Sequence, residues 1–113
     1  MQLPAILTLI ATALALVVGP ASHAQAQTKE TARADETILE MADAHRKADR
    51  KRLTTLLPQV RGHTLEPWAA YWELRARLES ASGKEVQDFM QRFAGTYQED
   101  RLRGDTHAVV FHA

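Results

Sequence analysis

One segment, residues 61–105, constrains the fold of this chain more than any other part. It reads RGHTLEPWAAYWELRARLESASGKEVQDFMQRFAGTYQEDRLRGD and contains both tryptophans, both tyrosines and two of the three phenylalanines. Its apolar residues recur at intervals of three and four, which is the spacing of one helix face. The segment therefore predicts consecutive amphipathic helices, each of which needs neighbours to cover its apolar side.

The first helix of this segment is expected over residues 65–80, with Pro67 in its first turn. It carries two apolar stripes on neighbouring parts of its surface. The stripe residues are Trp68 and Trp72 on one side and Tyr71, Leu74 and Leu78 on the other. Two stripes predict burial against two partners, as in a stack of helices.

The next helix is expected to open at Ser82, because Ser82 and Glu85 match a capping box. Its apolar face is expected to consist of Val86, Phe89, Met90 and Phe93. Gly95 is expected to end it. Thr96 and Glu99 then form a second possible capping box, which opens a short turn through residues 102–103.

Two earlier helices are expected before residue 62. The first begins near Arg33 and has Ile38, Met41, Ala42 and His45 on one face. The second is capped by Asp49 and repeats this spacing with Leu53, Leu56, Leu57 and Val60. Pro58 lacks an N–H, so this helix is expected to end or kink near Leu57, and Gly62 closes the unit.

The predicted fold is all-α. Four or five short helices over residues 33–103 are expected to stack as the start of an α-solenoid, and residues 104–113 are interpreted as an unrelated short tail.

The first 26 residues have the pattern of a signal peptide. Residues 3–18 are almost wholly apolar, and small residues then allow cleavage after Ala24 or Ala26. An uncleaved anchor is the less favoured alternative. Residues 27–32 are polar and are expected to form a loose linker. The chain has no cysteine, and a periplasmic location without membrane contact after cleavage is predicted.

Removal of 26 of the 113 residues leaves 87, which is enough for one small domain. The 14 basic and 14 acidic residues balance. This charge gives no reason to expect a nucleic acid partner.

Three groups of residues suggest a function, and each also has a structural interpretation. The basic cluster Arg46, Lys47, Arg50, Lys51 and Arg52 is a possible anion patch, but interspersed aspartates favour a solvated face. His45 and Asp49 have the spacing of two metal ligands on one helix face, but no third ligand is close in sequence. Trp68, Tyr71 and Trp72 would stack on sugar rings if exposed, but their helical spacing favours core packing. No catalytic, cofactor-binding or metal-binding residue is predicted.

Several runs of the sequence resemble the N-terminal helical region of soluble lytic murein transglycosylases. After Leu56-Leu57-Pro58, residues 63–74 (HTLEPWAAYWEL) are similar to a run of that family, HPL-x-PY-x-x-Y-x-x-L. Glu85-Val86 with residues 89–93 (FMQRF) is similar to its EV-x-x-FL-x-R-Y helix. Arg101-Leu102-Arg103 with Asp105 is similar to its RLR-x-DWL helix. The resemblance covers about residues 33–105.

The resemblance implies an α-superhelix of stacked helix pairs that carries a lysozyme-like domain at its C-terminus. In that family the C-terminal domain cleaves the β-1,4 bond between N-acetylmuramic acid and N-acetylglucosamine in peptidoglycan. A single glutamate serves as acid and then base, and the product is a 1,6-anhydro sugar. The resemblance implies no metal or organic cofactor.

The sequence departs from the family after Asp105. The family continues there with Trp-Leu, further helices and the catalytic domain with its Glu-Ser pair and Gly-Leu-Met-Gln-type motif, whereas this sequence continues THAVVFHA. No catalytic residue is therefore assigned, and the chain is expected to be inactive by itself. We expect a truncated scaffold part of a periplasmic lytic transglycosylase, from either a frameshifted gene or a short paralogue. The alternative is a free-standing periplasmic helical interaction module without enzymatic role.

Overall fold

The computed structural model of the protein describes residues 18–112, and all regular structure in that part of the chain is helical. The predicted all-α class is confirmed. In chain order the elements are α1 (Val18–Arg46), α2 (Arg50–Leu56), the 3-10 helix η1 (Leu57–Val60), α3 (Glu66–Ala76), the 3-10 helix η2 (Leu78–Ser80), α4 (Gly83–Arg92) and α5 (Tyr97–His112).

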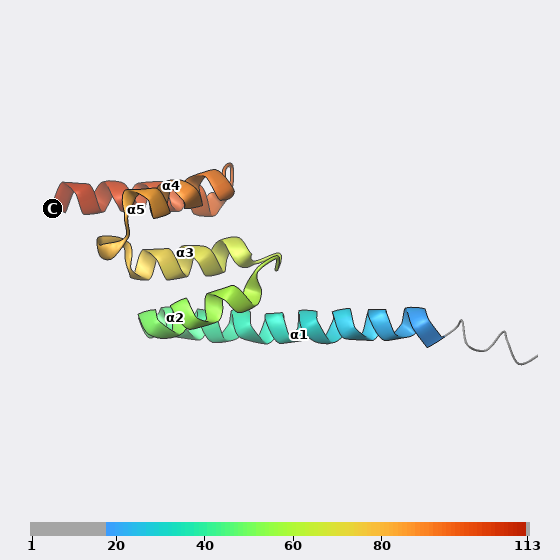
Figure 1. Ribbon diagram of the computed structural model, residues 1–113. Coiled ribbons are helices and arrows are strands. Elements are labelled where there is room, and N and C mark those ends of the chain that lie inside the picture. The colour runs from blue at the N-terminus through green and yellow to red at the C-terminus, as the bar shows by residue number, and fades with distance from the viewer. Residues whose placement is uncertain (1–17, 113) are drawn as a thin grey trace, which may run out of the picture. The chain divides into compact units, whose positions relative to one another are not determined.

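The chain divides into two compact units, Met1–Ala32 and Arg33–Ala113. Within the first unit the structure describes residues 18–32, which belong to α1. The packed helices all lie in the second unit. Figure 1 shows α2 against the last turns of α1, then α3, and then α4 and α5 beside each other.

The structure corrects the expected linker at residues 27–32. These residues are helical and continue α1. They contain neither glycine nor proline, and the hydroxyls of Thr28 and Thr31 donate to carbonyl oxygens four residues earlier, at 2.8 and 2.9 Å. The polar composition thus reflects exposure and not a break in the helix. The predicted signal peptide, residues 1–26, lies mostly outside the described residues.

The ends of the next helices follow local rules. α1 stops at Arg46 because Ala48 takes a left-handed backbone conformation, with φ 56°, and the Asp49 N–H donates back to the Ala44 carbonyl at 2.9 Å. The Asp49 carboxylate then accepts from the Arg52 N–H at 3.2 Å, so the predicted cap of α2 is confirmed. α2 ends at Leu56, one residue before the position predicted from Pro58, and tightens into η1.

Helix α3 contributes to two apolar cores, as its two stripes predict. The first core joins α1, α2 and η1 to one side of α3, and its buried residues are Ile38, Met41, Ala44, Leu53, Leu56, Val60 and Ala69. The second core joins α3 to α4 and α5, and its buried residues are Ala70, Tyr71, Leu74, Phe89, Phe93 and Leu102. Trp72 packs against both cores, whereas Trp68 packs only against the second. Both tryptophans therefore contact the second core, and only Trp72 also contacts the first.

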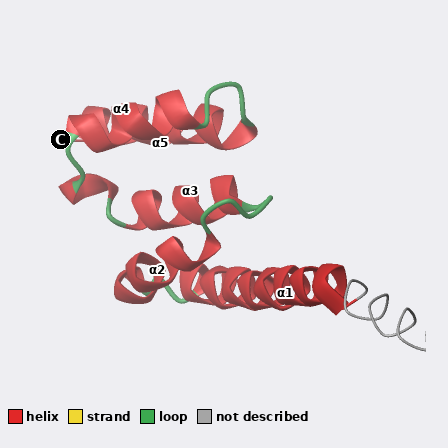
Figure 2. Ribbon diagram, turned by 45° about the vertical axis from the view of Figure 1, so that its right-hand side comes forward, coloured by secondary structure: helices red, strands yellow, loops and turns green. Residues whose placement is uncertain are grey.

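Helix α3 is shorter than predicted. It ends at Ala76, and the last expected residues form η2 after a break at Arg77. Short loops then lead into α4 and from α4 into α5 (Figure 2). Ser82 and Glu85 make both bonds of the capping box, which confirms the predicted start of α4. Thr96 Oγ1 accepts from the Glu99 N–H at 3.2 Å and caps the start of α5.

Helix α5 extends beyond the short turn that was predicted after Thr96. It includes residues 104–112, which lie in the predicted tail. Gly104 inside a helix costs about 1 kcal/mol relative to alanine. Contacts compensate for it, because Leu102 is fully buried and Asp105 accepts a hydrogen bond from Tyr71. Across residues 18–112, no helix has the length and apolar character needed to cross a membrane.

Replacement of Leu102 tests whether α5 is part of the core. Leu102→Ala removes a fully buried side chain, so we expect the free energy of unfolding to fall by about 3 kcal/mol. Leu39→Ala makes the same chemical change at a residue that is 71% exposed, and should stay within about 0.5 kcal/mol of the parent chain. Urea titrations followed by far-UV circular dichroism measure both values. Equal effects would show that α5 does not pack as described.

Candidate functional site

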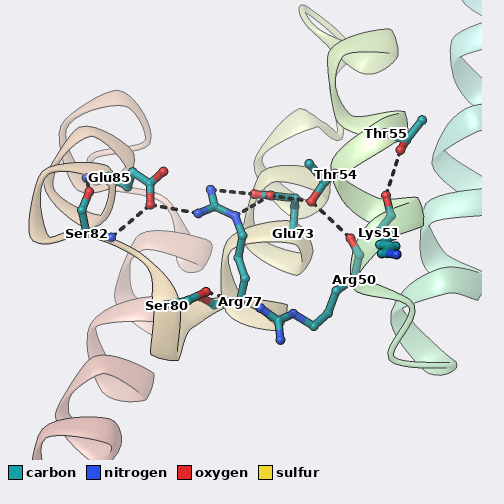
Figure 3. A network of polar contacts seen from close by, with 9 residues as sticks. All are labelled: Arg50, Lys51, Thr54, Thr55, Glu73, Arg77, Ser80, Ser82 and Glu85. Carbon is teal, nitrogen blue, oxygen red and sulfur yellow. Dashed lines mark hydrogen bonds and ion pairs between the residues drawn. The ribbon is translucent and has the colours of Figure 1, made fainter.

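A network of polar side chains connects α2, α3 and α4 (Figure 3). Its centre is Glu73 on α3, which is only 5% exposed. The Glu73 carboxylate accepts two hydrogen bonds from Arg77, at 2.5 and 3.2 Å, and one from Thr54 Oγ1 on α2, at 3.1 Å. A buried carboxylate is stable in the ionised form only when it is paired in this way.

Arg77 extends the network to α4. Its remaining terminal nitrogen donates to Glu85 at 2.9 Å. Glu85 also accepts from the Ser82 N–H at 3.1 Å as part of the capping box. The hydrogen bonds to Glu73 raise the pKa of Arg77 above its ordinary value, against the opposing effect of burial, and the bond to Glu85 adds to the rise. One guanidinium group therefore joins the C-terminal part of α3 to the start of α4.

An open pocket of about 500 Å³ lies next to this network. Its lining includes Arg50 from α2, Arg75 from α3, Ser80 from η2 and Asp105 from α5, together with Arg77 and Leu78. Four elements, α2, α3, η2 and α5, thus place charged and apolar groups around one cavity.

The three arginines of the pocket differ in how they are paired. Arg77 is bound by the two glutamates described above. Arg75 contacts Asp105 through Nε alone, at 3.3 Å. The Arg50 guanidinium donates to Ser80 Oγ at 3.3 Å, and within the described residues no carboxylate lies in ion-pair distance of it. The pocket therefore exposes guanidinium N–H groups that are not neutralised.

Asp105 has a second contact that holds it at the pocket wall. Its carboxylate accepts from the Tyr71 hydroxyl at 2.6 Å, and the same hydroxyl accepts from Arg101 Nε at 3.1 Å. Burial raises the pKa of Tyr71, and the hydrogen bond to Asp105 raises it further. Tyr71 is therefore a hydrogen-bond donor that positions the carboxylate, and not an acid.

A second buried carboxylate, Glu66, lies at the other end of α3. It is 7% exposed, accepts from the Gly62 N–H at 2.8 Å and forms an ion pair with Arg92 of α4. Gly62 has a positive φ of 84°, which fits the predicted turn after the second helix. Glu66 and Glu73 are seven residues apart and lie on one side of α3.

The aromatic residues pack as the structural interpretation predicts. Tyr71 is buried, and Trp68 and Trp72 are half-buried. The ring of Trp68 lies 6.1 Å from that of Tyr71 and 6.2 Å from that of Trp72. These residues therefore pack at the cores.

The His45–Asp49 pair has other roles in the structure. The ring of His45 stacks on Trp72, with centroids 5.5 Å apart and an angle of 19° between the planes. Asp49 caps α2. In the part of the chain that the structure describes, no three potential metal-ligating side chains lie together.

The basic cluster divides into three environments. Arg46 and Lys47 pair with Asp43 on α1, at 3.0 and 2.8 Å. Arg52 pairs with Glu40 at 3.3 Å, and Lys51 is exposed. Arg50 alone of the five lines the pocket. The predicted solvated face therefore accounts for most of the cluster, and Arg50 joins a different group.

Arg75, Arg77, Ser80 and Asp105 were not singled out as site residues from the sequence. The spacing of Glu73 and Arg77 indicates an ion pair on one helix face. The meeting of Arg75 with Asp105, thirty residues away in sequence, has no local signal. Comparison of the chain with models of known protein families, with curated proteins and with solved structures finds no match.

Removal of the Glu73 carboxylate tests the central ion pair. Glu73→Ala leaves Arg77 beside an apolar core, and the side chain of Arg77 is only 28% exposed. We expect a loss of about 2 kcal/mol in the free energy of unfolding, less than for a fully buried pair because water reaches Arg77.

Lys84→Ala is the matched control for Glu73→Ala. It breaks an ion pair of similar length, 2.9 Å to Asp88, in which both side chains are largely exposed. Exposed pairs of this kind contribute little, so the urea midpoint should hardly move. Equal midpoint shifts for the two variants would contradict the central role of Glu73.

His45 makes stability depend on pH. Burial lowers its pKa below the ordinary value of 6.5, and the positive charges of Arg75 and Arg101 lower it further. As pH falls through about 6.5, the unfolded chain binds a proton that the folded chain does not, so stability decreases until the lower folded pKa is reached. At pH values well above 6.5, His45 is neutral in both states and its contribution to the free energy of unfolding does not change with pH.

The His45→Gln variant should show a shallower loss of stability between pH 8 and pH 5. Thermal unfolding at several pH values in that range measures the slope. His23→Gln is the control, because His23 is an exposed residue of α1. A slope changed by His23→Gln and not by His45→Gln would contradict the assignment.

Proposed function

We propose that this chain is the N-terminal scaffold part of a periplasmic lytic transglycosylase that acts on peptidoglycan. In this proposal the described helices position other parts of the full-length protein and do no chemistry themselves. The observation that carries it is how the runs that resemble this family contact one another. Glu66 of the first run pairs with Arg92 of the second, and Tyr71 of the first bonds to Asp105 of the third.

The same runs also share one apolar core. Tyr71, Phe89, Phe93 and Leu102 all belong to the second core. These residues match the family pattern at separate places in the sequence and pack together in the structure. Such matches support a shared packing role better than isolated matches do. The role that they support is the packing of α3, α4 and α5.

The buried carboxylates favour a scaffold over an enzyme. A general acid in a glycosidase-type site needs a carboxyl group that can hold a proton in an apolar environment. Glu66 and Glu73 are buried, but arginines bind both of them. Their contacts are those of residues that hold helices together.

The alternative, a free-standing interaction module, rests on the two apolar stripes of α3. In the structure Trp72 packs against both cores, and the other residues of the two stripes pack against the second core, which joins α3 to α4 and α5. Helices of the same chain therefore contact the two stripes, and no external partner is needed to explain why α3 has them. We therefore favour the scaffold.

Incubation of the purified chain with isolated peptidoglycan sacculi tests the proposed lack of activity. Mass spectrometry of the soluble products should show no 1,6-anhydro muropeptides above the level of a heat-treated sample. Their release by the chain alone would contradict the proposal.

The DNA that follows the codon for Gly104 tests the family assignment. We expect a different reading frame to encode Trp-Leu and, further on, a Glu-Ser motif within a catalytic domain. A downstream sequence without these in any frame would overturn the frameshifted origin and leave a short paralogue or the interaction module.

A further inference from the structure

The open pocket beside η2 has no role in the proposed scaffold. Its polar lining brings together Arg50, Arg75 and Ser80 from α2, α3 and η2, and Glu79 of η2 and Asp105 of α5 are the acidic residues of the wall. Helix packing does not require Arg50 and Arg75 to point at the same cavity, because their side chains are largely exposed and belong to neither apolar core. Their convergence therefore has to be explained in another way.

The hydrogen-bonding capacity of the pocket is only partly used. Arg77 bonds through all three of its guanidinium nitrogens to Glu73 and Glu85 and is not available to a ligand. Arg75 is half-exposed and meets Asp105 through Nε alone. Arg50 reaches only the Ser80 hydroxyl among the described residues. Two guanidinium groups thus keep free N–H donors that face one volume of about 500 Å³.

Guanidinium groups bind planar and tetrahedral oxyanions through paired N–H donors. The Ser80 hydroxyl donates to the Arg77 carbonyl oxygen at 3.0 Å and accepts from Arg50, so it holds the Arg50 guanidinium at the pocket (Figure 3). Leu78, Ala76 and Ala108 supply an apolar part of the wall. This combination suits a small organic anion whose charged end meets the arginines and whose apolar body meets the wall.

We propose that the pocket binds the oxyanion of a small ligand, a carboxylate or a phosphate, through the guanidinium groups of Arg50 and Arg75. Asp105 has an opposing role in this site. It partly neutralises Arg75, so a bound anion competes with it for that guanidinium group. The site goes beyond the scaffold function and does not depend on it, since the geometry that carries it lies within one unit of the chain.

Two probe anions and one neutral analogue test the proposal on the full chain. N-acetylglycine represents the carboxylate, inorganic phosphate represents the phosphate, and N-acetylglycinamide is the uncharged analogue of the first. At constant ionic strength, chemical shift changes of the arginine side chains should give dissociation constants of about 1–10 mM for one or both anions, as expected for a few hydrogen bonds in an open site. Comparison of N-acetylglycine with phosphate shows whether the pocket binds a carboxylate, a phosphate or both.

Three variants assign the binding to named residues. Arg50→Gln and Arg75→Gln should each weaken the bound anion roughly tenfold, because each removes a charged hydrogen-bond donor. Lys51→Gln removes the same charge from the neighbouring exposed residue and should change the dissociation constant less than about twofold. Arg50 is exposed, so its variant should keep the circular dichroism spectrum of the parent chain.

A fourth variant tests the opposing role of Asp105. Asp105→Asn removes a negative charge from the pocket wall and keeps an oxygen that can accept from the Tyr71 hydroxyl. It should therefore tighten anion binding about threefold or more. A variant that only disturbed the structure would weaken binding instead.

Binding of either anion, with the stated dependence on Arg50 and Arg75, supports the proposal for that class of oxyanion. The proposal is overturned if neither anion binds, or if N-acetylglycinamide binds as tightly as N-acetylglycine while phosphate does not bind. It is also overturned if Lys51→Gln weakens binding as much as Arg50→Gln, because the anion would then respond only to the general charge of the surface.

Discussion

The ion pair between Glu73 and Arg77 is the interaction on which the arrangement of helices in residues 33–112 depends. Glu73 is nearly inaccessible to water, so its charge needs a partner. Arg77 supplies that partner and then reaches Glu85 at the start of α4. Thr54 reaches the same carboxylate from α2. The hydrogen bonds of this one ion pair thus reach α2 through Thr54 and α4 through Glu85.

A second buried carboxylate at the N-terminal end of α3 is also paired with an arginine. Glu66 is buried there and pairs with Arg92 of α4. The spacing of seven positions from Glu66 to Glu73 places both carboxylates on one side of α3, apart from the two faces that contact the apolar cores. α3 therefore has three kinds of surface in contact with neighbours. This explains why an eleven-residue helix organises the whole unit.

The apolar cores alone are small. A chain of this length buries a limited share of its surface, and conformational entropy offsets most of the hydrophobic contribution. The charged bonds between helices add little net stability, but they penalise other packings strongly, because any other packing would bury an unpaired charge. We infer that the cores hold the helices together and that the paired charges determine which arrangement they take. The pocket is a consequence, since the break between α3 and η2 turns Ser80 towards Arg50.

Much of the fold could be predicted from the amino-acid sequence, and the reason is local. Helix faces follow from apolar spacing, and the capping residues Asp49, Ser82 and Thr96 act within three positions of themselves. The error at residues 27–32 has a local cause as well, because these residues are polar but contain no helix breaker.

The candidate site could not be predicted in the same way. Arg50 was seen as one member of a basic cluster, and the sequence does not distinguish it from Lys51 or Arg52. Only the folded chain separates them, since Arg52 meets Glu40 and Arg50 meets Ser80. The sequence by itself thus determined which segments are helical and which faces are apolar. The tertiary structure decided which charges are neutralised and which remain free, because Coulomb interactions depend on distances between residues that are far apart along the chain.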